Sequence, residues 1–108
     1  MSLACKLLSV IALVPFVVYA QWLPTAPKHY SVQLFARIDD ARSLAIGPNG
    51  QIFVSTRRAG KVWALHDDDK DGYAERKQLV AENLDMPNGI AVCGTSLYVV
   101  TNQSILRF

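Results

Sequence analysis

After its first thirty residues, the chain consists of short runs in which apolar and polar residues alternate. The runs are rich in Val, Ile, Phe and Trp, and turns such as PNG (48–50) and RRAG (57–60) separate them. Strands of this length, joined by Gly-containing turns, are typical of antiparallel β-structure. No stretch keeps the period of about 3.6 residues of an amphipathic helix. We therefore predict an all-β fold, with strands at 30–38, 42–47, 51–56, 61–65 and 76–82.

The pattern of residues 43–65 recurs in residues 89–108. A period in the forties, with four short strands in each unit, is typical of a β-propeller blade. The alternative is two unrelated β-meanders, which share the same simple alternation of apolar and polar residues. The aligned segments are Leu44-Ala45-Ile46 with Ile90-Ala91-Val92, Phe53-Val54-Ser55 with Tyr98-Val99-Val100, and Lys61-Val62-Trp63-Ala64-Leu65 with Ser104-Ile105-Leu106-Arg107-Phe108.

The repeat predicts antiparallel four-stranded blades of a propeller that is incomplete in this chain. One blade spans about 41–81, a second begins at 89, and the stretch 30–36 is predicted to be an outer strand of a further blade. Propellers contain about four to eight blades, and a single blade cannot bury its faces alone. We therefore expect residues 30–108 to be the N-terminal part of a longer propeller. A small free-standing β-domain is the competing interpretation, and it would leave large aromatic side chains with few partners.

An apolar segment precedes the β pattern. One lysine comes before an apolar run over 7–18 that contains Pro15, and a small-residue site ends at Ala20. This order is typical of a secretory signal, and the run is shorter than the roughly 20 apolar residues of a membrane span. We predict a signal peptide at 1–20, a leader segment at 21–29, export to the periplasm or the outside of the cell, and no stable membrane span after cleavage.

Composition excludes some classes of partner. Eleven Lys and Arg face nine Asp and Glu, for a formal net charge of +2, and no basic stripe runs along the chain. A nucleic-acid-binding protein normally carries such a stripe, so we expect no nucleic-acid partner. Beyond residue 20 the only cysteine is Cys93, which excludes an internal disulfide there. Its strand-like surroundings predict a buried, inert thiol.

The acidic sequence DDDKDGYAE (67–75) follows the third strand of the predicted blade. It places aspartates at the first, third and fifth positions of a calcium-binding loop, with Gly72 at the sixth. The twelfth position, usually a bidentate Glu, is Gln78. Two interpretations stay open, a structural Ca²⁺ site and a solvated acidic turn. The predicted ligands are Asp67, Asp69, Asp71, the carbonyl of Tyr73 and Glu75.

Four segments together resemble the opening of the glucose/sorbosone dehydrogenase family. They are ARSLAIGPNGQIFVSTRRAGKVWAL, DDDKDGYAE, ENLDMPNGIAV and LYVVTNQSILRF, and the resemblance covers about 30–108. It implies an exported six-bladed propeller of the soluble quinoprotein sugar dehydrogenase type. Members of that family oxidise small-molecule sugars or sugar-derived aldehydes with pyrroloquinoline quinone. Calcium holds the quinone there, and a histidine acts as base.

Carrying the family's site over gives two positions. Arg58 and Asn88 are expected at the channel mouth, toward the cofactor, although Asn88 also suits a simple tight turn. Pro87 stands where better-studied members have a glutamine that faces the quinone. His29 and His66 are expected at the surface, so the resemblance gives no base here and the chain alone is predicted to be inactive. The alternative function is a secreted, non-catalytic propeller that binds a ligand or partner, which Pro87 favours.

Overall fold

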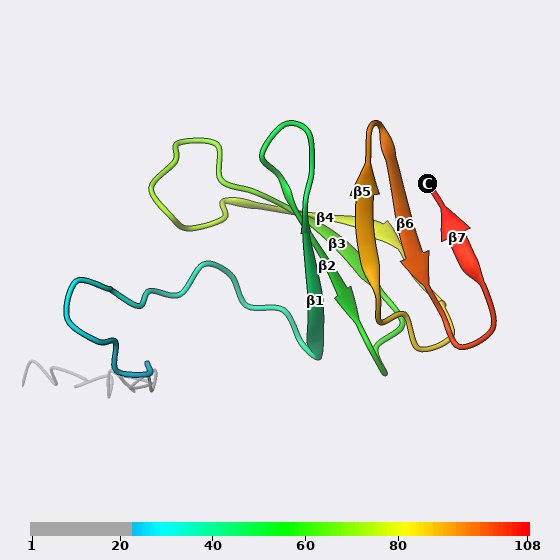
Figure 1. The fold of residues 1–108 in the computed structure, drawn as a ribbon, viewed down its shortest axis with the longest axis horizontal. Coiled ribbons are helices and arrows are strands. Elements are labelled where there is room, and N and C mark those ends of the chain that lie inside the picture. The colour runs from blue at the N-terminus through cyan, green and yellow to red at the C-terminus, as the bar shows by residue number, and fades with distance from the viewer. Residues whose placement is uncertain (1–22) are drawn as a thin grey trace, which may run out of the picture.

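The computed structural model describes residues 23–108, which form seven β-strands (Figure 1). The prediction of an all-β, antiparallel fold is confirmed, and residues 23–108 contain no helix that is long and apolar enough to cross a membrane. The predicted signal peptide lies outside the described residues. The strands are β1 (Ala41–Ile46), β2 (Ile52–Thr56), β3 (Val62–His66), β4 (Arg76–Ala81), β5 (Ile90–Cys93), β6 (Ser96–Val100) and β7 (Ile105–Arg107).

The strands form two antiparallel meanders, β1-β2-β3-β4 and β5-β6-β7. Because successive strands reverse direction, the connections alternate between the two ends of the sheets (Figure 1). One end carries the turn 47–51 and the acidic loop 67–75, and we call it the acidic-loop end. The opposite end carries the turns 57–61 and 101–104 and the connection 82–89 between the two sheets.

The internal repeat read from the sequence is confirmed by the strand register. Val54 lies opposite Leu44 and Trp63 in the first sheet, and its counterpart Val99 lies opposite Ile90 and Leu106 in the second. The other matched pairs are Ala45–Phe53 with Ala91–Tyr98, Phe53–Ala64 with Tyr98–Arg107, and Ser55–Val62 with Val100–Ile105. Residues 43–65 and 89–108 are therefore two copies of one structural unit.

The turn between the second and third strands of each unit also repeats. The Thr56 hydroxyl donates to the Lys61 carbonyl at 2.9 Å and accepts from the Lys61 amide at 2.8 Å. Thr101 makes the same two contacts with Ser104, both at 3.2 Å. A short polar side chain thus fixes the same turn twice, by bonding to the backbone across it.

Side chains on alternate positions of a strand point to opposite faces of the sheet. We call the side of the first sheet that carries Val54 and Leu65 its front face, and the side that carries Phe53 and Val62 its back face. The back face packs against Leu97 and Val99 of the second sheet, and this inter-sheet cluster is the larger part of the core. The sheets therefore lie face to face, one against the next (Figure 1).

The segment 30–38, predicted as a strand, forms no strand in the structure. It runs across the front face, where Phe35, Ala36 and Ile38 pack on the cluster of Val54 and Leu65. Its apolar alternation therefore serves packing rather than strand pairing. The four strands predicted at 42–47, 51–56, 61–65 and 76–82 agree with β1 to β4 within one or two residues.

Cys93 is exposed, so the prediction of a buried thiol is wrong. It is the last residue of β5, opposite Ser96. Its neighbour Val92 contacts the inter-sheet cluster, so alternation turns Cys93 to the other face. That face has no sheet packed against it among residues 23–108.

Candidate metal centre

The acidic loop joins β3 to β4 and is fixed at its base. The Glu75 amide donates to the His66 carbonyl at 3.0 Å, next to the His66–Arg76 pair that ends the β3–β4 ladder. The next anchor is Ala74, which is buried and donates its amide to the Phe35 carbonyl at 2.9 Å. The loop is therefore held both by its own sheet and by the segment that crosses the front face.

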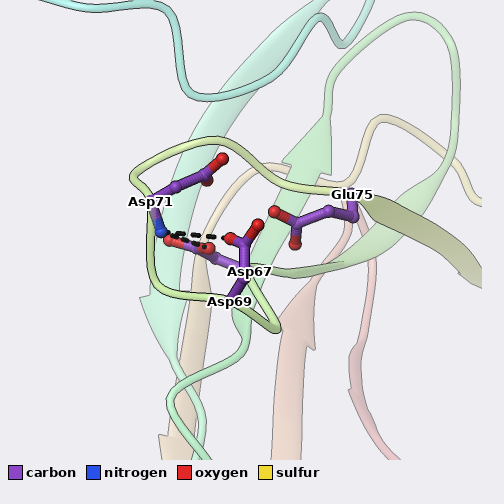
Figure 2. A group of neighbouring side chains, drawn as sticks. All are labelled: Asp67, Asp69, Asp71 and Glu75. Atoms are coloured by element: carbon purple, nitrogen blue, oxygen red, sulfur yellow. Dashed lines mark hydrogen bonds between the residues drawn. The ribbon is translucent and has the colours of Figure 1, made fainter.

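Four of the five predicted ligand residues converge in the loop. One carboxylate oxygen from each of Asp67, Asp69, Asp71 and Glu75 can be chosen so that all lie within 4.8 Å of one another. Figure 2 shows these four side chains gathered on the inner side of the loop. Ca²⁺ takes about six to eight oxygen ligands at about 2.3–2.6 Å, so small movements of these groups around one ion would meet its needs.

Backbone amides preorganise the carboxylates. The Asp71 amide donates to Asp67 Oδ1 at 3.2 Å and to Asp69 Oδ1 at 3.1 Å, and the Gly72 amide donates to Asp67 Oδ2 at 2.9 Å. Gly72 has φ +86°, and a Cβ added there would lie 1.9 Å from Gln33 Nε2. Only glycine therefore fits the sharp turn, as the sequence motif predicts.

The four carboxylates repel one another. The contact with the Glu75 carboxyl raises the pKa of Asp69 above its ordinary value of 3.8. A raised pKa means that the folded loop disfavours the second negative charge at this place. A divalent cation at the centre of the cluster would remove that penalty, because it is attracted to every carboxylate at once.

Asp68 lies in the same loop but is not one of the cluster. Its carboxylate accepts from Arg76 Nε at 2.7 Å and from the second guanidinium nitrogen at 2.9 Å. The Arg76 guanidinium lowers the pKa of Asp68. Asp68 is thus a loop aspartate with an arginine partner of its own.

The seventh and twelfth positions of the calcium-loop motif are Tyr73 and Gln78. Tyr73 donates its amide to Asp71 Oδ1 at 2.8 Å, and its side chain is half exposed. Gln78, at the twelfth position, lies in β4 opposite Ala64. A strand therefore follows this loop where a helix would otherwise begin, and Glu75 is the carboxylate that closes the cluster.

Arg58 and Asn88 lie at the end of the sheets opposite the acidic loop. The Asn88 carbonyl accepts from the buried Ser55 hydroxyl at 2.6 Å, and its side-chain oxygen accepts from Arg42 Nε at 3.3 Å. The Arg58 amide donates to the Asp40 carboxylate, while its side chain is exposed. No hydrogen bond links Arg58 to Asn88 among residues 23–108. Both residues make hydrogen bonds to other segments at this end of the sheets.

The two histidines differ in their surroundings. His29 is exposed, as predicted. His66 is half-buried, and its Nε2 atom is buried without a hydrogen-bond partner among the described residues. The prediction of a surface histidine is therefore only partly right for His66, because the residue is half-buried and its Nε2 atom is fully buried.

A cavity beside β3 had no signal in the sequence. Arg37, Lys61 and Lys77 line a cavity of about 330 Å³ together with Trp63 and Asp39. Lys61 Nζ lies 5.9 Å from the centre of the Trp63 ring, within the range of a cation–π contact. Three cations beside an indole ring suit an anionic ligand. The three are far apart in the sequence, and only the packing of the segment 30–38 onto the sheet brings them together.

A second cavity of about 330 Å³ is apolar and lies on the front face, where Leu44, Val54 and Leu65 are among its lining residues. Neither cavity is lined by Arg58 or Asn88. No protein-family model matches the chain, and no curated protein matches it. The resemblance stays a prediction carried by the quoted motifs.

Proposed function

We propose that the chain contributes propeller-type blades to an exported protein of the glucose/sorbosone dehydrogenase kind, which oxidises sugars or aldehydes with pyrroloquinoline quinone. The observation that carries this proposal is the common register of β1–β3 and β5–β7, pair by pair. A unit of four strands, repeated at about 45 residues and stacked face to face, is the way a propeller is built. The quoted motifs then select the family.

In this proposal the chain is scaffold. A general base must lie within hydrogen-bond reach of the proton that it removes. His29 is exposed in the leader segment, and His66 Nε2 is buried at the end of β3. The chain's own contributions are the faces that stack and the acidic loop, where Ca²⁺ would join β3 to β4. An ion there would be structural, because the loop and the residues Arg58 and Asn88 lie at opposite ends of the sheets.

Removing the chain tests the proposal. Cells that normally make it should lose quinone-dependent oxidation of glucose or other aldoses in their exported fraction when the coding segment for 23–108 is deleted. Restoring the segment should restore the activity, and a version with Val62→Asp, which disrupts the core, should not. Undiminished oxidation after deletion would contradict the proposal.

A specific observation favours a second candidate, a non-catalytic exported propeller that binds an anionic ligand. Arg37, Lys61 and Lys77 converge beside Trp63, and neither Arg58 nor Asn88 is among the residues that line this cavity. Carboxylate- or phosphate-bearing small molecules match this chemistry, since charge-assisted hydrogen bonds to such groups are stronger than neutral ones.

Calorimetric titration with citrate and with inorganic phosphate tests the second candidate. Binding should weaken with rising salt, because partly exposed charges are screened. It should also fall at least tenfold for Lys61→Ala. Lys70→Ala, which removes an exposed lysine from the acidic loop, is the matched control and should leave binding unchanged. Equal binding by both variants would exclude this cavity as the site.

A further inference from the structure

The chain contains one acceptor pattern for N-linked carbohydrate, Asn102-Gln103-Ser104. The pattern is an asparagine followed two residues later by serine or threonine, with any residue except proline between them. In an exported protein, such an asparagine is an attachment point for carbohydrate on a surface loop. The other asparagines of the chain have Gln51, Asp85 or Ile90 at the place of the serine. Asn102 is therefore the one asparagine that fits the pattern.

The structure places this triplet in the turn between β6 and β7. The Thr101 amide donates to the Ser104 carbonyl at 2.8 Å, and the hydroxyls of the same two residues lie 2.8 Å apart. These contacts close the turn. Asn102, Gln103 and Ser104 are all exposed. The turn thus has a defined backbone and an exposed asparagine, to which a large polar group can be attached without a change in the core.

The backbone of the turn does not require an asparagine at position 102. Asparagine is common in tight turns because it tolerates a positive φ, but Asn102 is not among the residues with positive φ. Its Nδ2 atom donates one long hydrogen bond, at 3.3 Å, to the exposed Asp85 carboxylate. A side-chain amide nitrogen carries two hydrogens. A sugar can therefore replace one hydrogen while the other keeps the contact with Asp85.

The equivalent turn of the first unit is held more closely by its neighbours. There the Asp40 carboxylate accepts from two amides of the turn. Gly60 is buried, and a Cβ added to it would lie 2.6 Å from the Leu84 carbonyl oxygen. Asn102, in contrast, is hydrogen-bonded only to Asp85 among residues 23–108. Of the two repeated turns, the more open one carries the acceptor pattern.

We propose that Asn102 carries an N-linked oligosaccharide. The co-reactant is a sugar joined through its C1 atom to a lipid diphosphate. Asn102 Nδ2 attacks C1, so that an N–C bond forms, the C1–O bond to the diphosphate breaks and Nδ2 gives up one proton. The lipid diphosphate leaves, and nothing is oxidised or reduced. The carbohydrate is a bulky, solubilising group, and it stands at the end of the sheets opposite the acidic loop.

The test uses the full chain recovered from the exported fraction of cells that normally make it. Its intact mass should exceed that of the polypeptide by the mass of one oligosaccharide. A peptide N-glycosidase, which releases the sugar and leaves an aspartate, should remove this excess and convert Asn102 alone. Asn102→Gln and Ser104→Ala should each abolish the excess mass. Ser104→Thr should keep it, because threonine also satisfies the pattern.

Asn49→Gln is the matched control, because Asn49 is an exposed turn asparagine outside the pattern, and this variant should keep the excess mass. All variants should retain the β-sheet circular dichroism of the wild type, since the changed positions are exposed. The proposal goes beyond sugar oxidation and rests only on the export that is part of the proposed function. An exported chain with the bare polypeptide mass would overturn it and leave the oxidation standing.

Two further outcomes would also contradict the proposal. Excess mass that survives in Asn102→Gln would mean that the attached group is on another residue. A chain that stays inside the cell without carbohydrate would contradict both the proposed export and the modification of Asn102.

Discussion

Asp40 fixes the entry of the chain into β1. Its carboxylate accepts from the Arg58 and Ala59 amides, the latter at 2.9 Å, and its carbonyl accepts from the Arg57 amide. Its φ of 60° lies in the left-handed region, which aspartate tolerates better than most residues. Asp85 is its counterpart in the second unit, with contacts to the backbone and side chain of Asn102 alone.

The contacts of Asp40 give a prediction for acid stability. The hydrogen bond from the Ala59 amide, with those from Arg58 and Arg57, lowers the pKa of Asp40 below its ordinary 3.8. A lowered folded-state pKa contributes stability that is present above 3.8 and is lost as pH falls through the folded value. Asp40→Asn should therefore lower the melting temperature at pH 6 and reduce the fall in stability between pH 5 and pH 3.

Urea unfolding at several pH values measures both effects. Asp85→Asn is the matched control, because the Asp85 carboxylate accepts only one long side-chain bond, at 3.3 Å. It should change stability less than Asp40→Asn does. Identical acid profiles for the wild type and Asp40→Asn would show that the backbone contacts of Asp40 do not contribute to stability.

Thr56 and Thr101 allow a second comparison of equivalent residues. Thr56 is 0% exposed and Thr101 is half-buried. Thr56→Val leaves the Lys61 amide without the hydroxyl acceptor, which should cost about 1–3 kcal/mol because a buried donor loses its partner. Thr101→Val should cost about 0.5 kcal/mol or less, since water reaches that turn. Denaturant titration measures the difference, and equal losses would contradict the burial argument.

At the scale of elements, the acidic loop predicts calcium-dependent stability. A ligand that binds only the folded state stabilises it by about 2.7 kcal/mol at about 100 times its Kd. In a domain of this size each kcal/mol raises the melting temperature by about 4–8 °C. Calcium should therefore raise the melting temperature, and Asp69→Asn or Asp71→Asn should remove most of the increase.

Asp68→Asn is the matched control for the loop, because Asp68 pairs with Arg76 outside the cluster. It should keep the calcium increment. The increment should also shrink at low pH, since carboxylates must lose their protons to bind a metal. With the pKa of Asp69 raised, the loss should begin at a higher pH than for an ordinary aspartate. Melting curves that coincide in calcium and in chelator would leave only a solvated acidic turn.

Strand order and register were predictable because local rules agree in this part of the chain. PNG and RRAG demand turns, and the alternation between them fixes which face each side chain takes. The same alternation misled at 30–38, because an extended segment packed on a sheet buries alternate residues just as a strand does. The alternation of apolar residues indicates which side chains are buried. It does not indicate whether a neighbouring strand is available for backbone hydrogen bonding.

The candidate metal site was predictable to a similar degree. Asp67, Asp69 and Asp71 were readable because a loop motif places its ligands within a few residues of each other. The cationic cavity was not, since Arg37 reaches Lys61 and Lys77 only through the packing of the segment 30–38. The burial of His66 Nε2 was missed for the same reason, because the burial of a single side-chain atom depends on packing in three dimensions.

At the scale of the whole molecule, we predict that the purified chain does not oxidise sugars. Supplied with pyrroloquinoline quinone and Ca²⁺, it should reduce no dye with glucose or other aldoses beyond the rate of the quinone alone. The chain carries two histidines, and neither is placed as a base. Turnover by a folded sample, abolished by His66→Gln, would contradict the assignment of His66 to structure.

The match between one unit's back face and the next unit's front face also bears on how such a chain can lengthen. Duplication of the coding segment for about 45 residues adds a sheet that already carries the matching contact surface, so no new interface has to evolve. Each further copy also moves the exposed apolar face outward without enlarging it.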